Sequence, residues 1–132
     1  PNKKGLINMS KANWTNMIEI DEEFLEKVYA EVAKIPFGKI STYGTIAELA
    51  GYPRASREVG IAMSRVPGNS NLPCHRVVNK NGTLAPDYVF GSQEQQRNLL
   101  LEESITFLPD GTINIAKHMW PKDEQEEQME LF

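Results

Sequence analysis

Residues 42–64, TYGTIAELAGYPRASREVGIAMS, form the stretch that decides the fold. Thr42 can cap a first helix, whose apolar positions recur at helical spacing and which Gly51 ends. After a tight Tyr-Pro-Arg-Ala turn, Ser56 can cap a second helix that runs from Arg57 to about residue 64. Two short helices joined by a turn with Gly and Pro, the second rich in small residues and arginine, predict a helix-turn-helix. An ordinary helix pair has the same pattern, so the pattern alone leaves DNA binding open.

The segments on either side predict further short elements. Upstream, Asp21 can cap a helix with one apolar face, and Pro36 stops it. Downstream, residues 76–78 and 83–84 predict two strands around an Asn-Lys-Asn-Gly turn, which together make a small hairpin or wing.

The C-terminal third completes a small domain. Residues 85–91 read as a loop, and a capping box at Ser92 opens a helix that ends near Ser104. Residues 105–115 then predict a second hairpin around Pro-Asp-Gly. The expected fold is therefore mainly α with small β hairpins, a single winged helix-turn-helix-like domain over residues 21–120. A flexible arm (residues 1–20) and an acidic disordered tail (residues 121–132) are expected on its two sides.

Charge is unevenly distributed along the chain, whose formal net charge is −4 at pH 7. Residues 34–80 hold seven lysines and arginines against two glutamates, a local balance of +5, so the remainder carries −9. A basic block in an acidic chain fits a local anionic partner, although a solvated surface has the same composition. With no apolar run of membrane length, no secretory signal and a single cysteine, we expect a reducing compartment such as the cytoplasm, at the nucleoid in a bacterium.

Residues 72–78, LPCHRVV, hold the single cysteine of the chain beside one of its two histidines. A lone cysteine is either a small buried filler or a reactive thiol. Pro73 fixes the approach to Cys74, and the cationic neighbours His75 and Arg76 favour the thiolate. These neighbours favour the reactive thiol.

A cysteine nucleophile needs a base and a group that orients the base. His75 is adjacent to Cys74, and Glu102 or Glu103 at a helix C-terminal end is placed to orient it. Side chains at successive strand positions point to opposite faces, so the pair requires that the backbone turns between them. The second histidine, His118, is far away in the chain, and neither a zinc-ligand spacing nor a glycine-rich phosphate loop is present.

Four stretches, in the same order, resemble the O6-alkylguanine-DNA alkyltransferases. Residues 73–77 (PCHRV) look like the active-site motif of that family, and residues 35–44 (IPFGKISTYG) like the entry into its helix-turn-helix. Residues 57–63 (REVGIAM) resemble its recognition helix, and residues 99–103 (LLLEE) its closing helix. The resemblance spans residues 22–107, and the set of motifs is much more specific than any one of them.

The resemblance implies a monomeric repair protein, without cofactor, metal or membrane, that binds double-stranded DNA containing O6-alkylguanine through the minor groove and flips the base. Cys74 would accept the alkyl group irreversibly, with His75 as base through a water and Glu103 to orient it. Arg57 matches the arginine that replaces the flipped nucleotide, and Tyr43 the tyrosine that helps to rotate its phosphate. The implied DNA-binding residues are Thr42, Tyr43, Ser56, Arg57, Gly60, Arg65 and Arg76. The implied substrate-pocket residues are Tyr43, Pro73, Val89, Phe90 and Gly91.

Three departures keep two other functions open. Only about 20 residues precede the core, where the repair enzymes carry an α/β domain. The hinge asparagine that usually follows the recognition helix in that family is not at the corresponding place, which residues 65–69 occupy. Residues 86–92 replace the glycine-rich substrate loop of the family. The alkyltransferase-like proteins, which lack the reactive cysteine and flag alkylated guanine for nucleotide excision repair proteins, are the first alternative. A plain winged-helix DNA-binding module with a structural cysteine is the second.

Overall fold

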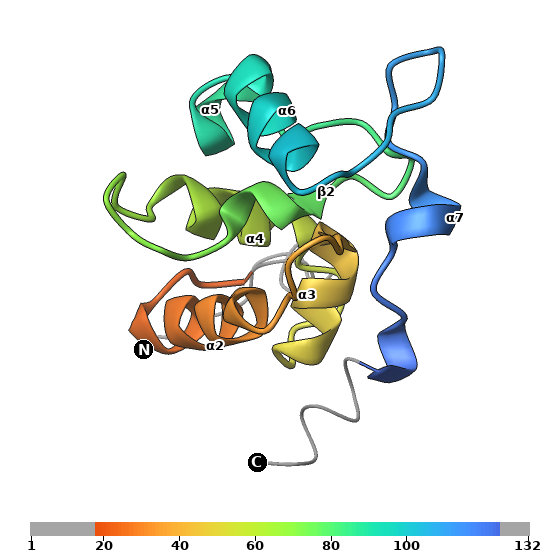
Figure 1. Cartoon of the computed structure of the whole chain (residues 1–132). Coiled ribbons are helices and arrows are strands. Elements are labelled where there is room, and N and C mark those ends of the chain that lie inside the picture. Colours follow the sequence, from red (N-terminus) through yellow and green to blue (C-terminus); the bar gives the residue numbers. More distant parts are fainter. Residues whose placement is uncertain (1–17, 125–132) are drawn as a thin grey trace, which may run out of the picture.

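A computed structural model describes residues 18–124, apart from the side chains of Tyr88 and Phe90. Most of the predicted arm and tail, residues 1–17 and 125–132, lies outside the described residues. The elements in chain order are α2 (Glu22–Ala33), β1 (Ser41–Thr42), α3 (Tyr43–Leu49), α4 (Ser56–Ser64), the 3-10 turn η1 (Cys74–Arg76), β2 (Val77–Val78), α5 (Asp87–Phe90), α6 (Gln93–Glu102) and α7 (Ile115–His118). Figure 1 shows α2 and α3 on one side of α4 and β2, with α5 and α6 on the other.

The helix α2 begins and stops as its sequence predicts. The carboxylate of Asp21 accepts a hydrogen bond from the N–H of Phe24 at 2.9 Å, which satisfies one of the free donors of the first turn. Phe24, Val28 and Val32 recur on one face and are all fully buried. The helix ends shortly before Pro36, which has no N–H to continue it.

The helices α3 and α4 form the predicted helix-turn-helix, with one difference at the start of α4. Thr42 Oγ1 accepts a hydrogen bond from the N–H of Thr45 at 3.2 Å, so Thr42 caps α3 as expected. The prediction that Ser56 caps α4 is wrong, because the helix already begins at Ser56 and no side chain caps it. Ala55 stands at the cap position and is fully buried, so apolar packing and not a hydroxyl places this helix start.

Two apolar clusters hold the domain together. The first joins α2, α3 and α4 and includes Phe24, Val28, Ile46, Val59, Ala62, Met63 and, from the C-terminal segment, Trp120. The second lies beside α6 and consists of Ile40, Val78, Leu84, Leu100, Ile105 and Ile113. Each fully buried aliphatic side chain stabilises the fold by about 1.5–3 kcal/mol relative to exposure. The two clusters therefore fix α4 and β2 in the middle of the molecule.

The first predicted hairpin is wrong in its pairing. Val77 and Val78 form β2, but β2 pairs in parallel with β1, in the register Ser41 to Val77 and Thr42 to Val78. Residues 83–84 are not a strand. Both valines are fully buried, so β2 lies in the interior of the domain, and its partner in this two-stranded sheet is the segment that leads into α3. A pattern confined to one stretch of chain does not reveal a parallel partner that is distant in the sequence.

The predicted turn at residues 79–82 is present and is fixed by its side chains. Asn79 Nδ2 donates to Thr83 Oγ1 at 2.9 Å, and the N–H of Thr83 donates to Asn81 Oδ1 at 3.2 Å. Gly82 has a φ of +88°, and a Cβ there would lie 3.0 Å from the carbonyl oxygen of Ile113. This glycine thus permits both the left-handed backbone and the close approach of the neighbouring segment.

The segment from residue 85 to 115 differs from its prediction at both ends, since Ile115, expected in a strand, begins the helix α7. Residues 85–91, expected as a loop, contain the short helix α5. Ser92 caps α6 as predicted, since its Oγ accepts from the N–H of Gln95 at 3.0 Å. The second hairpin is present as a single antiparallel bridge between Phe107 and Ile113. Backbone hydrogen bonds close it, from the N–H of Leu108 to the carbonyl of Thr112 at 2.7 Å and from the N–H of Asn114 to the carbonyl of Thr106 at 3.0 Å.

The C-terminal segment returns to the helix-turn-helix. Met119 forms a parallel bridge with Ile40, and the N–H of Trp120 donates to the carbonyl of Ile40 at 2.9 Å. Lys122 Nζ then lies 2.7 Å from a carboxylate oxygen of Glu48 on α3. Within residues 18–124, no helix is long and apolar enough to cross a membrane.

Candidate active site and nucleic-acid interface

Cys74 and His75 lie on the 3-10 turn η1 and not on a strand. The N–H of Cys74 donates to the carbonyl of Leu72 at 2.8 Å, and the N–H of Arg76 donates to the carbonyl of Pro73 at 3.1 Å. Successive side chains of a 3-10 turn do not point to opposite faces as they do in a strand, so the side chains of Cys74 and His75 can face the same cavity. Cys74 and His75 line one cavity of about 690 Å³.

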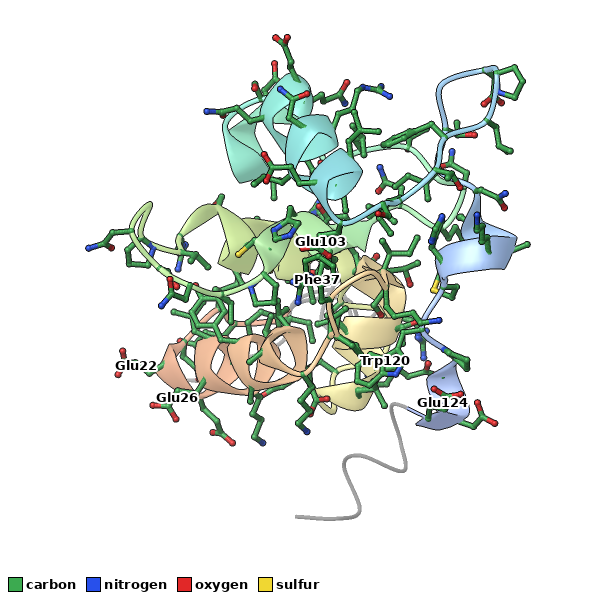
Figure 2. All side chains as sticks on the ribbon, in the orientation of Figure 1. Glu22, Glu26, Phe37, Glu103, Trp120 and Glu124 are labelled. Carbon is green, nitrogen blue, oxygen red and sulfur yellow. The ribbon has the colours of Figure 1, made fainter. Side chains whose placement is uncertain are left out.

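Glu103 is the carboxylate that the fold brings to His75. Its Oε2 lies 2.6 Å from His75 Nε2, and Glu103 is buried whereas Glu102 is exposed. Arg76 donates to the same carboxylate from Nε at 3.0 Å and from Nη2 at 2.8 Å, and the N–H of Gly38 donates to Oε1 at 2.8 Å. Burial raises the pKa of Glu103, but the hydrogen bonds from Arg76, Gly38 and His75 outweigh it and hold this pKa below its ordinary value. Figure 2 shows Glu103 in the interior of the domain, where Arg76 of the turn η1 donates to its carboxylate.

Arg76 has a role beyond the one expected of it. Its Nη1 donates to the carbonyl of Ile35 at 2.7 Å, and its guanidinium lies 5.7 Å from the centre of the Phe37 ring. With its other nitrogens on Glu103, Arg76 is turned inward, and a DNA contact of this side chain stays a prediction. Arg76 ties the turn η1 to the C-terminal end of α6.

Burial favours the neutral form of the Cys74 thiol. Burial raises the pKa of Cys74 to about 11, so the cationic neighbours do not produce the thiolate that was expected of them. A thiol with this pKa is almost entirely protonated at neutral pH. Any reaction of Cys74 therefore needs a base, and His75 lines the same cavity with its Nε2 held by Glu103.

The cavity beside Cys74 combines an apolar wall with a polar rim. The wall comes from Met63 on α4, Leu72 before η1, and Val89 on α5. Ser70, Asn71, Gln95 and Asn98 contribute polar side chains. Of the pocket residues predicted from the sequence, Val89 lines this cavity, whereas Pro73 and Gly91 are not among the described residues that line it. The side chain of Phe90 lies outside the described part.

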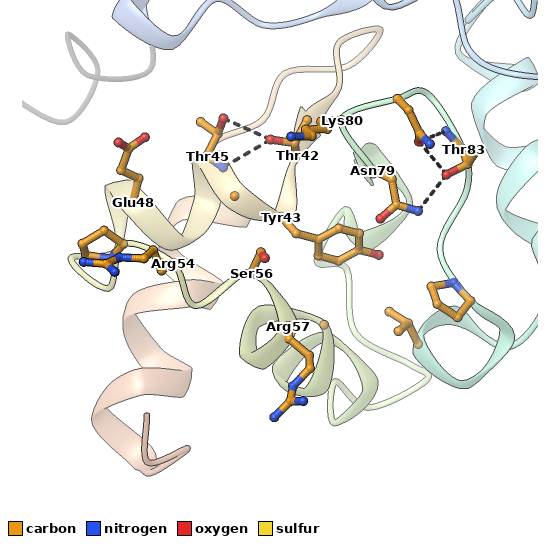
Figure 3. Close-up of a pocket in the computed structure, with 16 residues that line it drawn as sticks. Thr42, Tyr43, Thr45, Glu48, Arg54, Ser56, Arg57, Asn79, Lys80 and Thr83 are labelled. Atoms are coloured by element: carbon orange, nitrogen blue, oxygen red, sulfur yellow. Dashed lines mark hydrogen bonds between the residues drawn. The ribbon is translucent and has the colours of Figure 1, made fainter. Parts of the chain in front are cut away.

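A groove of about 930 Å³ lies on the other side of α5 and is shown in Figure 3. It runs between the helix-turn-helix and the turn at residues 79–83. The predicted residues Thr42, Tyr43, Ser56, Arg57 and Gly60 all line it. Arg57 is largely exposed, with 83% of its side chain accessible, whereas Tyr43 is buried at its edge. Val89 lines both the groove and the Cys74 cavity and so stands between them.

The groove also contains residues that the sequence did not suggest. Arg54, Lys80 and Asn79 line it, whereas the predicted Arg65 is not among the described residues of its wall. Lys80 belonged to the basic block, but only the turn between β2 and residue 83 brings it opposite α4. Glu48 lines the groove as well, and its ion pair with Lys122 offsets the charge that it would otherwise place there.

Metal ligation has no support among residues 18–124, where no three His, Cys, Asp or Glu residues lie close enough to hold an ion. His118, the second histidine, is buried away from Cys74. Its Nε2 lies 2.9 Å from the N–H of Thr106 and 2.8 Å from Thr106 Oγ1. An N–H can only donate, so Nε2 of His118 is an acceptor and the imidazole is neutral.

Known proteins share both the sequence pattern and this fold. The DNA-binding domain of 6-O-methylguanine DNA methyltransferase matches residues 23–105. The DNA base-flipping protein of Escherichia coli is 41% identical over 106 residues, which make up 78% of each chain. The methylated-DNA–protein-cysteine methyltransferase of Methanosarcina acetivorans is 43% identical over 82 residues, 62% of this chain and 52% of that one.

One similar solved structure matches this chain over nearly the whole of its own length. The S. pombe protein Atl1, in complex with damaged DNA containing O6-carboxymethylguanine, superposes with a TM-score of 0.68 at 36% identity. The superposition covers 76% of this chain and 97% of Atl1. The family match spans more than half of the chain, and the helix-turn-helix-like fold agrees with it. The chain therefore belongs to the family defined by the DNA-binding domain of 6-O-methylguanine DNA methyltransferase.

Proposed function

We propose that this protein binds double-stranded DNA containing O6-alkylguanine, rotates the damaged base out of the helix and takes its alkyl group onto Cys74. One observation carries the proposal. Cys74 lines a cavity together with His75, and His75 Nε2 lies 2.6 Å from Glu103, which Arg76 holds in turn. A nucleophile, a base and an oriented carboxylate in this order form the arrangement that nucleophilic catalysis requires.

The transfer is a single displacement at the alkyl carbon. His75 donates from Nε2 to the Glu103 carboxylate, so Nδ1 is the nitrogen with the lone pair that takes the proton of the Cys74 thiol through a water. The Cys74 Sγ–carbon bond forms as the carbon–O6 bond of guanine breaks, and the guanine leaving group recovers a proton. The imidazolium formed on the way is stabilised by Glu103. The thioether is stable, so each molecule acts once.

The groove supplies the DNA side of the proposal. Arg57 and Arg54 on one wall and Lys80 on the other present positive charge to phosphates of the two strands. Arg57, a largely exposed groove residue of α4, is placed to fill the space that the rotated nucleotide leaves. Val89 stands between groove and cavity, so a base that leaves the groove passes it to reach Cys74.

A lesion sensor without alkyl transfer is the second candidate. Two observations favour it: burial raises the pKa of Cys74 to about 11, and the superposition covers 97% of Atl1. By contrast, the chain matches only 52% of the methyltransferase of Methanosarcina acetivorans. A sensor would use the same groove and cavity but leave the lesion intact, for removal by other repair proteins.

Intact-mass measurement separates these candidates. The protein is incubated with a duplex oligonucleotide that contains O6-methylguanine, and a gain of about 14 Da is expected on the wild type and none on Cys74→Ser. Lesion-selective binding without this gain would contradict transfer and leave the sensor. Equal affinity for damaged and undamaged duplexes would contradict both and leave a plain DNA-binding module.

A further inference from the structure

Gln96 is a buried amide on α6 that reaches two other segments of the domain. Its Nε2 donates to the carbonyl of His75 at 3.1 Å and to the carbonyl of Val77 at 3.2 Å. Its Oε1 accepts from the N–H of Ala85 at 2.8 Å. The side chain is fully buried, with 0% of its surface accessible. Both amide hydrogens and the amide oxygen are therefore used, and each on a backbone group.

The carbonyl of His75 belongs to the turn η1, which carries Cys74, and the carbonyl of Val77 follows this turn at the start of β2. A 3-10 turn of three residues has few hydrogen bonds of its own, so groups outside it must hold it in place. Gln96 holds its C-terminal side, while Arg76 holds it to the carboxylate of Glu103. The two ties act on the same turn from the same helix.

The third bond fixes the opposite side of the cavity. Ala85 is buried and begins the segment that continues into α5, on which Val89 lines the cavity beside Cys74. Figure 1 shows α5 next to α6, with η1 and β2 beneath them. One side chain on α6 thus sets the position of the Cys74 turn relative to the Val89 wall.

We propose that Gln96 is a positioning residue for alkyl transfer, which holds the Cys74 turn and the Val89 wall at the separation that in-line attack requires. The inference rests on the proposed function, because the attack is the proposed reaction. Near-attack geometry is sensitive to displacements of about 1 Å, so loosening either segment lowers the rate far more than it lowers DNA affinity. Gln96 lines neither the groove nor the cavity among their described residues, so it acts through its neighbours.

Three variants of the full chain test this role. Gln96→Met keeps the volume of the side chain but removes all three hydrogen bonds. Gln96→Glu keeps the shape, and a carboxyl buried there is expected to be protonated, so it retains one donor and one acceptor. Gln93→Met is the matched control, because Gln93 lies on the exposed face of α6 and its side-chain Nε2 donates to the carbonyl of Ala85 at 3.2 Å.

The first measurement is the single-turnover rate of methyl transfer beside the dissociation constant for the lesion duplex. We expect Gln96→Met to lower the rate by about 30-fold and to change the dissociation constant by less than about threefold. Gln96→Glu should fall between Gln96→Met and the wild type, and Gln93→Met should stay within about twofold of the wild type. Equal losses in Gln96→Met and Gln93→Met, or a loss confined to DNA affinity, would overturn the assignment.

The second measurement does not depend on alkyl transfer. Iodoacetamide alkylates the thiolate of Cys74, so its pH profile reports how well the turn keeps the thiol buried. We expect the midpoint of the alkylation rate against pH to fall by about half a pH unit or more in Gln96→Met, and by less in Gln96→Glu. If the wild type gains no methyl, the proposed function fails, and a profile unchanged in both Gln96 variants is the separate result that would remove the positioning role.

Discussion

Replacing Glu103 by glutamine is the most direct test of the site. The carboxylate receives hydrogen bonds from Arg76 at 2.8 and 3.0 Å, from the N–H of Gly38 at 2.8 Å and from His75 at 2.6 Å. Glutamine has the same shape but no charge, and its amide has one accepting oxygen and one donating NH₂ group. It therefore leaves the inward-turned guanidinium of Arg76 without a counter-charge.

The expected loss of stability follows from burial. Glu103 is 7% exposed, and removing one partner of a buried ion pair destabilises a protein by about 3–5 kcal/mol. The amide oxygen still accepts one hydrogen bond, so we expect the lower end, about 3 kcal/mol. With an m-value of about 1.5–2 kcal/mol/M, this loss lowers the urea midpoint by about 1.5–2 M.

The expected effect on alkyl transfer follows from the tautomer of His75. An amide N–H facing Nε2 favours the form in which Nδ1 carries the hydrogen, so the base no longer has its lone pair toward Cys74. General-base assistance contributes about 100-fold or more, so the single-turnover rate should fall by about that factor.

The adjacent residue supplies the control for Glu103→Gln. Glu102→Gln removes the same charge from an exposed side chain, and neither the urea midpoint nor the transfer rate should change measurably. Urea denaturation and single-turnover transfer are measured on both variants under the same conditions. If Glu103→Gln behaves like Glu102→Gln in both assays, Glu103 neither holds Arg76 nor orients His75, and the proposed site is wrong.

Three further predictions concern the groove and the fold. In a gel-shift titration, Arg57→Ala should weaken binding to the lesion duplex about 10-fold or more. Arg65 lies outside the groove, so Arg65→Ala should weaken this binding by no more than the loss of one phosphate contact. Equal losses of affinity in the two variants would contradict the role of Arg57. Gly82 has a φ of +88°, so Gly82→Ala should lower the free energy of unfolding, measured by urea denaturation, by about 1–3 kcal/mol. An unchanged midpoint of urea unfolding would show that the turn accommodates the added Cβ without strain. Burial, followed by nearby lysine charges, lowers the pKa of His118, so the unfolded chain binds the proton more readily. Stability should then decline as pH falls below about 6.5, and His118→Gln should remove this decline.

Local signals in the sequence predicted most of the helices. Asp21, Thr42 and Ser92 each cap a helix as expected, because a capping hydrogen bond reaches only two or three residues along the chain. The start of α4 was misplaced by one residue, since the buried Ala55 positions it through contacts that its own stretch does not show. Helix α5 was missed because it is a single turn inside a segment rich in loop residues.

The sequence by itself determined the helix-turn-helix and predicted Cys74, His75 and Arg57 as residues of the site. These inferences depend on residue type and local spacing, both of which are read directly from the chain. Only the tertiary structure decided that β2 pairs with β1, that Glu103 rather than Glu102 meets His75, and that Gln96 holds the Cys74 turn. Each of these contacts joins segments far apart in the sequence, and burial, not local preference, selects the partner. For the same reason Arg76, which was expected to contact DNA, is directed inward to the carboxylate of Glu103.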